Sequence, residues 1–147
     1  MPLDRTWIED NIPHHGRMCL LDEVIEWNAQ QIRCRATSHR LSDHPLRSEG
    51  RLGVAAGIEY AAQAMAAHGA LSGATGRPEA GFLVGLRDVR FNVLRLDTIE
   101  SGLICEATLV AGDHGTALYE FAIRSRSAQL MSGRATVVFD ANQHWNS

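Results

Sequence analysis

The chain has 147 residues, a net charge of −3 and no lysine, so that all 14 of its basic residues are arginines. This length is typical of one domain, and a hydrophobic content of 45% with 21% charged residues supports a globular core. The slight acidic balance disfavours a general nucleic-acid binder, which needs a basic surface for phosphate contacts. We therefore expect one domain over residues 1–147, with its core in residues 7–139, and no nucleic-acid partner.

The cysteines and the N-terminal segment indicate the compartment. Cys19, Cys34 and Cys105 are odd in number and widely spaced in apolar surroundings, which indicates buried, reduced thiols rather than disulfides or a zinc site. The N-terminus lacks a basic region followed by an apolar stretch, and no apolar run reaches the roughly 18 residues that a membrane span needs. We expect a cytoplasmic protein that has no membrane partner.

The first half of the chain predicts two short strands between two helices. Residues 3–13 predict a short helix that ends at a proline, and residues 18–27 and 29–38 predict strands from their apolar patterns. The polar segment 38–51 predicts a loop. Residues 53–71 predict the one long helix, which is rich in alanine and glycine.

The second half predicts strands alone. Four are expected, with a hairpin turn between the second and third, at residues 81–93, 98–112, 116–127 and 129–140. We expect them to form an antiparallel meander. A single long helix has to bury itself against such a sheet, which predicts an α+β fold. The small residues of the helix favour a sheet that closes tightly around it.

Glu59 and Gln63 are the polar pair of this helix. They are four residues apart and therefore share one helical face. Neighbouring alanines would leave a carboxylate poorly solvated, which would raise the pKa of Glu59 towards a value suited to proton transfer, and Gln63 could orient it. The alternative is the solvent-exposed face of an amphipathic helix, where Glu and Gln are common. The pattern alone favours this alternative.

The residues before Glu59 add candidates. Unpaired backbone N–H groups at the helix start, around Gly53 and Val54, could bind a developing enolate oxygen, although every helix has such an end. His44, in the preceding loop, is close enough in sequence to return over the Glu59 face. A cluster of His14, His44 and Glu59 could in principle bind a metal, but no metal-binding spacing is present, so we expect no metal.

Three motifs resemble, in the same order, motifs of bacterial 3-hydroxyacyl-acyl carrier protein dehydratases. IPHHGRMCLLDEV resembles the opening of that family, GIEYAAQA resembles its helix motif, and GFLVGLRDVRFNVLRLDT resembles the strand that follows. The resemblance covers roughly residues 7–139. It implies a hotdog fold, an antiparallel sheet wrapped around one long central helix, and a dimer whose active sites lie at the subunit interface.

The resemblance also implies a reaction. A (3R)-3-hydroxyacyl thioester, carried on the phosphopantetheine of acyl carrier protein, would lose water to give a trans-2-enoyl thioester. His44 would remove the C2 proton and Glu59 would protonate the departing C3 hydroxyl. Amides at Gly53 and Val54 would bind the thioester oxygen, and Gln63 would support Glu59. No cofactor is needed, because the elimination of water changes no redox state.

The loop around His44 departs from the family pattern. Asp43 replaces a glycine, the phenylalanine after the histidine is missing, and His44 precedes Glu59 by fifteen residues rather than fourteen. The combination of HPL with GIEYAAQA resembles the dehydratase-like proteins of aryl polyene pigment synthesis in Gram-negative bacteria. Fatty acid, aryl polyene and polyketide synthesis therefore stay open as pathways. Two alternatives also stay open: a hotdog acyl thioesterase in which Glu59 activates water, and a catalytically weak structural partner of another hotdog dehydratase.

The expected partners are acyl carrier protein and a second hotdog subunit, identical or different. Docking of the carrier would depend on surface arginines that meet an acidic helix. Four arginines are candidates for this contact: Arg90, Arg95, Arg124 and Arg126. The alternative for each is an ordinary solvated arginine on a strand.

Overall fold

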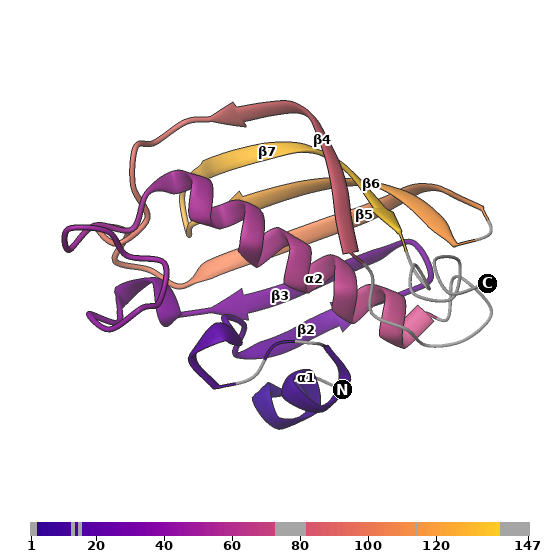
Figure 1. Cartoon of the computed structure of the whole chain (residues 1–147), viewed down its shortest axis with the longest axis horizontal. Coiled ribbons are helices and arrows are strands. Elements are labelled where there is room, and N and C mark those ends of the chain that lie inside the picture. The colour runs from indigo at the N-terminus through magenta and orange to yellow at the C-terminus, as the bar shows by residue number, and fades with distance from the viewer. Residues whose placement is uncertain (1–2, 13, 15, 73–81, 114, 139–147) are drawn as a thin grey trace.

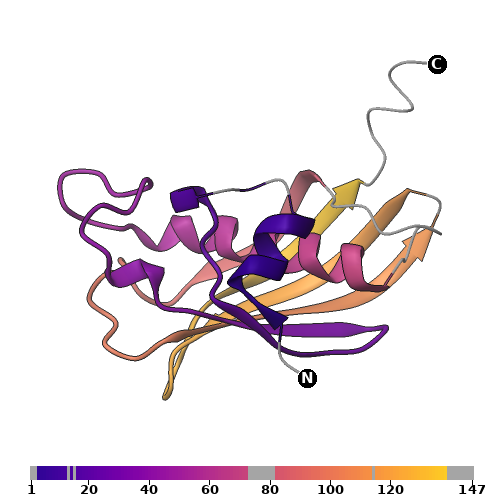
Figure 2. The same cartoon turned by 90° about the horizontal axis from the view of Figure 1, so that it is seen from below.

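A computed structural model describes residues 3–12, 14, 16–72, 82–113 and 115–138. One seven-stranded antiparallel sheet supports one long helix, α2 (Gly57–Ser72), with the short helix α1 (Arg5–Asn11) beside it (Figure 1). Both helices lie on the same side of the sheet (Figure 2). The strands are β1 (Leu3–Asp4), β2 (Glu23–Trp27), β3 (Gln31–Ala36), β4 (Phe82–Phe91), β5 (Leu103–Asp113), β6 (Thr116–Arg124) and β7 (Gln129–Val138). The α+β fold with one long helix against an antiparallel sheet is confirmed.

The ends of several elements differ from the sequence prediction. The strand predicted from Met18 is β2, which begins only at Glu23, because residues 16–18 form a short 3-10 turn. The long helix begins with a 3-10 turn over Val54–Ala56 and becomes α-helical at Gly57. Strand β1 has two residues and was not expected. Gly115 has φ of +76° in the β5–β6 hairpin, which agrees with the predicted turn.

The strand order is β1-β2-β3-β5-β6-β7-β4, which contradicts the four-strand meander. β5, β6 and β7 are joined by hairpins, but β5 also pairs with β3, and β4 pairs with β7 at the sheet edge. The segment after β4 returns past the start of the long helix, where the Val54 amide donates to the Leu94 carbonyl at 3.1 Å. Strands that follow one another in sequence are usually, but not always, neighbours in the sheet. Here the connection after β4 leads from the sheet edge to β5, which lies between β3 and β6.

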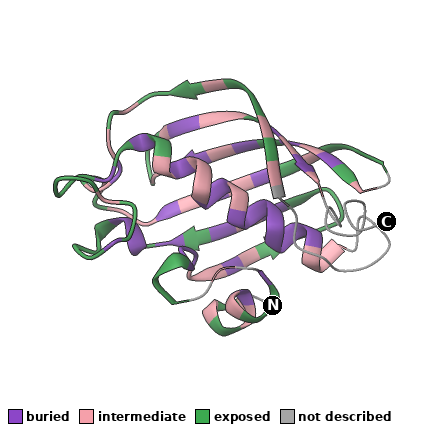
Figure 3. Cartoon of the chain, viewed as in Figure 1, coloured by how far each residue is buried: buried purple, intermediate pink, exposed green. Residues whose placement is uncertain are grey.

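Helix α2 is buried along most of its length (Figure 3). Its small residues allow close approach to the strands, as expected. His68 lies on the sheet side, where Nδ1 accepts from the Tyr119 hydroxyl at 2.6 Å and Nε2 donates to the Asn28 carbonyl at 2.9 Å. Burial lowers the pKa of His68, so the ring is held neutral between these two partners. Within the described residues, no helix is both long and apolar enough to cross a membrane.

Gly57, at the first α-helical position, lies close to the sheet, with little room for a side chain. A Cβ atom on this residue would overlap the sulfur of Met131 and come within 3.5 Å of Cγ1 of Ile123. We expect Gly57→Ala to reduce the free energy of unfolding by about 1–3 kcal/mol, because inserted volume strains a packed core. Urea unfolding measures the loss. Gly85→Ala in β4, where the nearest atom would be 3.9 Å away, is the control. Equal stability of the two variants would contradict this packing argument.

Candidate active site

Glu59 lies in the first turn of α2 and borders a hollow of about 470 Å³. The other residues that line the hollow are apolar or glycine: Leu46, Gly53, Ala55, Ala56 and Ile58. The Glu59 side chain is 34% exposed, so its carboxylate is accessible from the solvent. An apolar hollow with a single carboxylate at its edge suits an uncharged chain with one polar reacting group.

His14 contacts Glu59 directly. Its Nε2 atom lies 2.8 Å from Oε1 of Glu59, and the histidine comes from the segment between α1 and the 3-10 turn at residues 16–18. This hydrogen bond lowers the pKa of Glu59 below its ordinary value, and it outweighs burial, which acts in the opposite direction. The expected rise in the pKa of Glu59 is therefore wrong. The hydrogen bond from His14, which stabilises the carboxylate, decides the direction of the pKa shift, and burial among the alanines has the smaller effect.

Gln63 is fully buried, so the solvent-face alternative is wrong for this position. Its Oε1 accepts from the Leu20 amide at 2.9 Å, and its Nε2 donates to the Met18 carbonyl at 2.7 Å. Gln63 also makes the smallest contribution to lowering the pKa of Glu59. Its main role in the structure is to attach residues 18–20 to the helix, and this attachment holds the chain that follows His14.

His44 does not contact Glu59 within one chain and lies instead against Tyr60, the next helix residue. Its Nδ1 accepts from the Leu46 amide at 3.0 Å, so a neutral ring carries its proton on Nε2. Nε2 then donates to the Tyr60 hydroxyl at 3.0 Å. The side chain is only 5% exposed, and burial lowers the pKa of His44. Both ring nitrogens are therefore occupied, and neither has a free lone pair for a substrate proton.

The hydrogen bonds of His44 continue through Tyr60 into the protein. Because the Tyr60 hydroxyl accepts from His44, it donates to Oγ of Ser38 at 2.7 Å, and Ser38 donates to the Leu20 carbonyl at 2.8 Å. Tyr60 is fully buried and Ser38 nearly so. Ser38 donates to a backbone carbonyl, so it accepts from Tyr60, and Tyr60 in turn accepts from His44. This series of hydrogen bonds therefore also requires the proton of His44 on Nε2.

Tyr60→Phe tests this network. The change removes the acceptor of the His44 Nε2 proton and leaves a buried donor unpaired, so we expect the free energy of unfolding to fall by about 1–3 kcal/mol. Chemical denaturation measures the loss. In a double-mutant cycle, Ser38→Ala combined with Tyr60→Phe should cost less than the sum of the two single changes. Strict additivity would show that the two hydroxyls do not act together.

The helix start offers different amides from those expected. The Val54 amide already donates to the Leu94 carbonyl, so it is not free to bind a thioester oxygen. The amides of Gly53 and Ala55 make no hydrogen bond within the part of the chain that the structure describes. Both residues line the hollow beside Glu59. The candidate oxyanion donors are therefore Gly53 and Ala55, because the Val54 amide is used by its hydrogen bond to the segment after β4.

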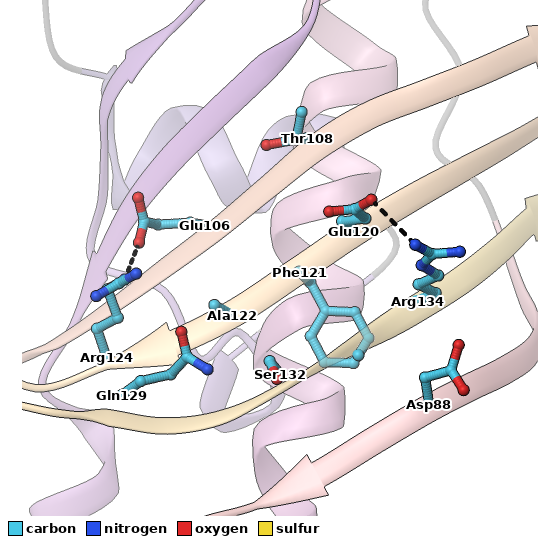
Figure 4. Close-up of a pocket in the computed structure, with 11 residues that line it drawn as sticks. Asp88, Glu106, Thr108, Glu120, Phe121, Ala122, Arg124, Gln129, Ser132 and Arg134 are labelled. Carbon is cyan, nitrogen blue, oxygen red and sulfur yellow. Dashed lines mark ion pairs between the residues drawn. The ribbon is translucent and has the colours of Figure 1, made fainter.

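A second hollow, of about 380 Å³, lies on the sheet face opposite α2 (Figure 4). Both arginines that line it are paired: Arg124 contacts Glu106 at 2.6 Å and Arg134 contacts Glu120 at 3.6 Å. Arg95, near the helix start, is likewise paired with Asp97. Two of the four expected docking arginines, Arg95 and Arg124, thus already have acidic partners in their own chain. Arg90 and Arg126 stay candidates for carrier binding.

Tyr60 was not predicted as a member of the site, and His14 was considered only in a metal-binding cluster with His44 and Glu59, which was discounted. His14 also belongs to the opening motif, but nothing in its spacing predicted a hydrogen bond to Glu59. Tyr60 was the only large aromatic residue between small residues of the long helix, which was a usable signal. Among the described residues, no three His, Cys, Asp or Glu side chains gather as a metal site.

Similar proteins support the hotdog fold. A chain of the dehydratase heterocomplex ApeI:P from Xenorhabdus doucetiae is 25% identical, with a TM-score of 0.77, over 95% of this chain and 94% of the other. A thioesterase of Haemophilus influenzae is 13% identical, with a TM-score of 0.57, over 80% and 76% of the two chains. A virulence protein of Campylobacter jejuni is 14% identical, with a TM-score of 0.63, over 94% and 91%. The last two likenesses concern the fold alone.

Among curated protein sequences, none matches this chain significantly. The sequence pattern of the ApeP-like family, described as ApeP dehydratase, matches residues 6–145. This match covers nearly the whole chain, including the segment of His14, the helix of Glu59 and the strands β2 to β7. The chain therefore belongs to the ApeP-like dehydratase family.

Proposed function

We propose that this chain is one subunit of a hotdog dehydratase that removes water from (3R)-3-hydroxyacyl thioesters on acyl carrier protein. The observation that supports it most is the accessible Glu59 carboxyl group at the edge of an apolar hollow, next to the free amides of Gly53 and Ala55. The family match and the likeness to a chain of the ApeI:P dehydratase heterocomplex support the reaction class. The resemblance of HPL and GIEYAAQA to dehydratase-like proteins of aryl polyene synthesis favours that pathway over fatty acid synthesis.

The residues suggest the following division of labour. A base takes the C2 proton, the electron pair of that bond forms the C2–C3 double bond, and the C3–O bond breaks. The hydroxyl leaves as water with a proton from Glu59. Amides of Gly53 and Ala55 stabilise the negative charge on the thioester oxygen. No cofactor has a part in these steps.

The base, in this proposal, comes from a second and different hotdog subunit. The observation behind this is that His44 has both ring nitrogens occupied inside its own chain. The solved relative is named as a dehydratase heterocomplex, ApeI:P, which suits such a pairing. A weaker candidate is a dimer of identical copies, in which His44 would have to turn away from Leu46 before it could act as base.

An assay of product type tests the reaction. The assembled protein is given a 3-hydroxyacyl thioester of acyl carrier protein, and the products are separated by mass spectrometry. We expect a product lighter by one water and still attached to the carrier. Release of free thiol without enoyl product would instead support the hotdog thioesterase, in which Glu59 activates water at the carbonyl carbon.

A further inference from the structure

His14 is the only titratable side chain that the described structure places on Glu59. Its Nε2 lies 2.8 Å from Oε1 of the carboxyl group, although the two residues belong to different elements. The hollow beside Glu59 contains no other charged side chain, and the remaining polar influence is the amide of Gln63. Within the described residues, control over the ionisation of Glu59 therefore lies with His14.

The other ring nitrogen of His14 decides which group donates. Nδ1 is buried and has no hydrogen-bond partner among the described residues. A proton on Nδ1 would be a buried donor without an acceptor, which is unfavourable. The ring therefore carries its proton on Nε2 and donates it to Oε1 of Glu59. The second carboxyl oxygen, Oε2, is then the one that exchanges a proton.

The segment that follows His14 is held at two points. Arg5, on α1, donates through Nη2 to the carbonyl of Gly16 at 2.8 Å, and Gln63 holds the residues that follow at the helix. The ring itself is only partly exposed, with 25% of its side-chain surface accessible. A side chain held in this way can keep a carboxyl group in one orientation, which is what a precise proton transfer needs.

We propose that His14 is a positioning residue for Glu59, whose Nε2 proton holds Oε1 so that Oε2 exchanges a proton with the substrate. This inference rests on the proposed function. In the hydration direction, Oε2 takes one proton from water, the water oxygen bonds to C3, and the electron pair of the double bond takes a proton at C2 from the base of the second subunit. His14 keeps its proton throughout, so it acts through Glu59.

Three variants and one control test the proposal. His14→Ala and His14→Phe remove the donor, while His14→Gln places an amide N–H near the position of Nε2. Arg17→Gln is the control, because Arg17 is an exposed cation of the same segment that lies 3.7 Å from Asp43 and not beside Glu59. The Glu59 carboxyl group is titrated in the free full-length chain by carbon-13 NMR, with Glu59→Gln used to assign its signal.

We expect His14→Ala and His14→Phe to move the titration of Glu59 to higher pH, because the donor that favours the carboxylate is gone while burial remains. Hydration needs the carboxylate, so the acidic limb of the kcat profile of the assembled protein should move to higher pH as well. The maximal kcat should fall by on the order of 10²-fold with little change in KM. His14→Gln should restore the limb and most of kcat.

The titration and the turnover separate two kinds of failure. The proposal is overturned if Glu59 titrates at the same pH in His14→Ala, His14→Phe and the wild type, or if Arg17→Gln moves it equally. A lower kcat with an unmoved limb would also overturn it, since that is the result of a merely structural role. Absence of hydration by the assembled wild type would instead overturn the proposed function, and the titration in the free chain would still decide whether His14 acts on Glu59.

Discussion

Replacement of Glu59 by Gln is expected to reduce the turnover of enoyl and 3-hydroxyacyl thioesters by about 10²- to 10⁴-fold, the usual contribution of a positioned acid or base. The amide has the shape of the carboxyl group but neither releases nor takes up the proton. Glu59 is partly exposed at the edge of the hollow, so its loss removes no core packing. The measurement is the rate of hydration by the assembled protein under saturating substrate.

The control for Glu59→Gln is the stability of the same variant. Its unfolding transition should stay close to that of the wild type, apart from the change of one hydrogen bond between His14 and residue 59, both of which are partly exposed. Near wild-type turnover in Glu59→Gln would remove this carboxyl group from the mechanism. It would leave the hollow without a proton-transfer group among its lining residues.

The second large effect is expected from assembly. The chain alone should hydrate enoyl thioesters at least about 10²-fold more slowly than the same chain co-expressed with a different hotdog dehydratase subunit, because a missing base costs on that order. In the proposed mechanism His44 is not the base inside its own chain, since the Leu46 amide and the Tyr60 hydroxyl occupy its ring nitrogens. Steady-state rates of the two preparations, at equal concentration of this chain, measure the difference.

A mixed assembly that contains Glu59→Gln is the matched control for this experiment. If the rescued activity uses the hollow of this chain, the rescue should disappear with Glu59→Gln and persist with the control Arg17→Gln. Equal rates for the chain with and without the second subunit would contradict the requirement for a partner. That result would favour an active dimer of two identical chains, in which His44 leaves its present hydrogen bonds and acts as the base.

The sequence predicted the fold well because the signals for it are local. Alternation in the strands, glycine at the hairpin and a long run of small residues in the helix each depend on near neighbours. The strand order was mispredicted at β4, since nothing in the local pattern says whether a strand pairs with the next one or crosses to the sheet edge. Only the pairing of β4 with β7 decides this.

The candidate site was predicted in part for the same reason. Glu59 and Gln63 share a helix, and their spacing alone placed them together. The contact of His14 with Glu59 joins residues 45 positions apart, and it forms only because the segment before β2 packs against α2. The contact also reverses the expected direction of the pKa of Glu59. The environment of a carboxyl group thus depends on long-range packing that no spacing rule contains.

The crossover after β4 has a consequence for how this family can vary. The start of the long helix is held by two hydrogen bonds of Leu52. Its carbonyl accepts from the Leu96 amide at 2.7 Å, and its amide donates to the side-chain Oδ1 of Asp97 at 3.0 Å. These bonds fix where Glu59 emerges, whatever the length of the loop that precedes them. A change in the length of the loop before Leu52 therefore need not displace the carboxyl group, which accounts for how one extra residue between His44 and Glu59 is tolerated.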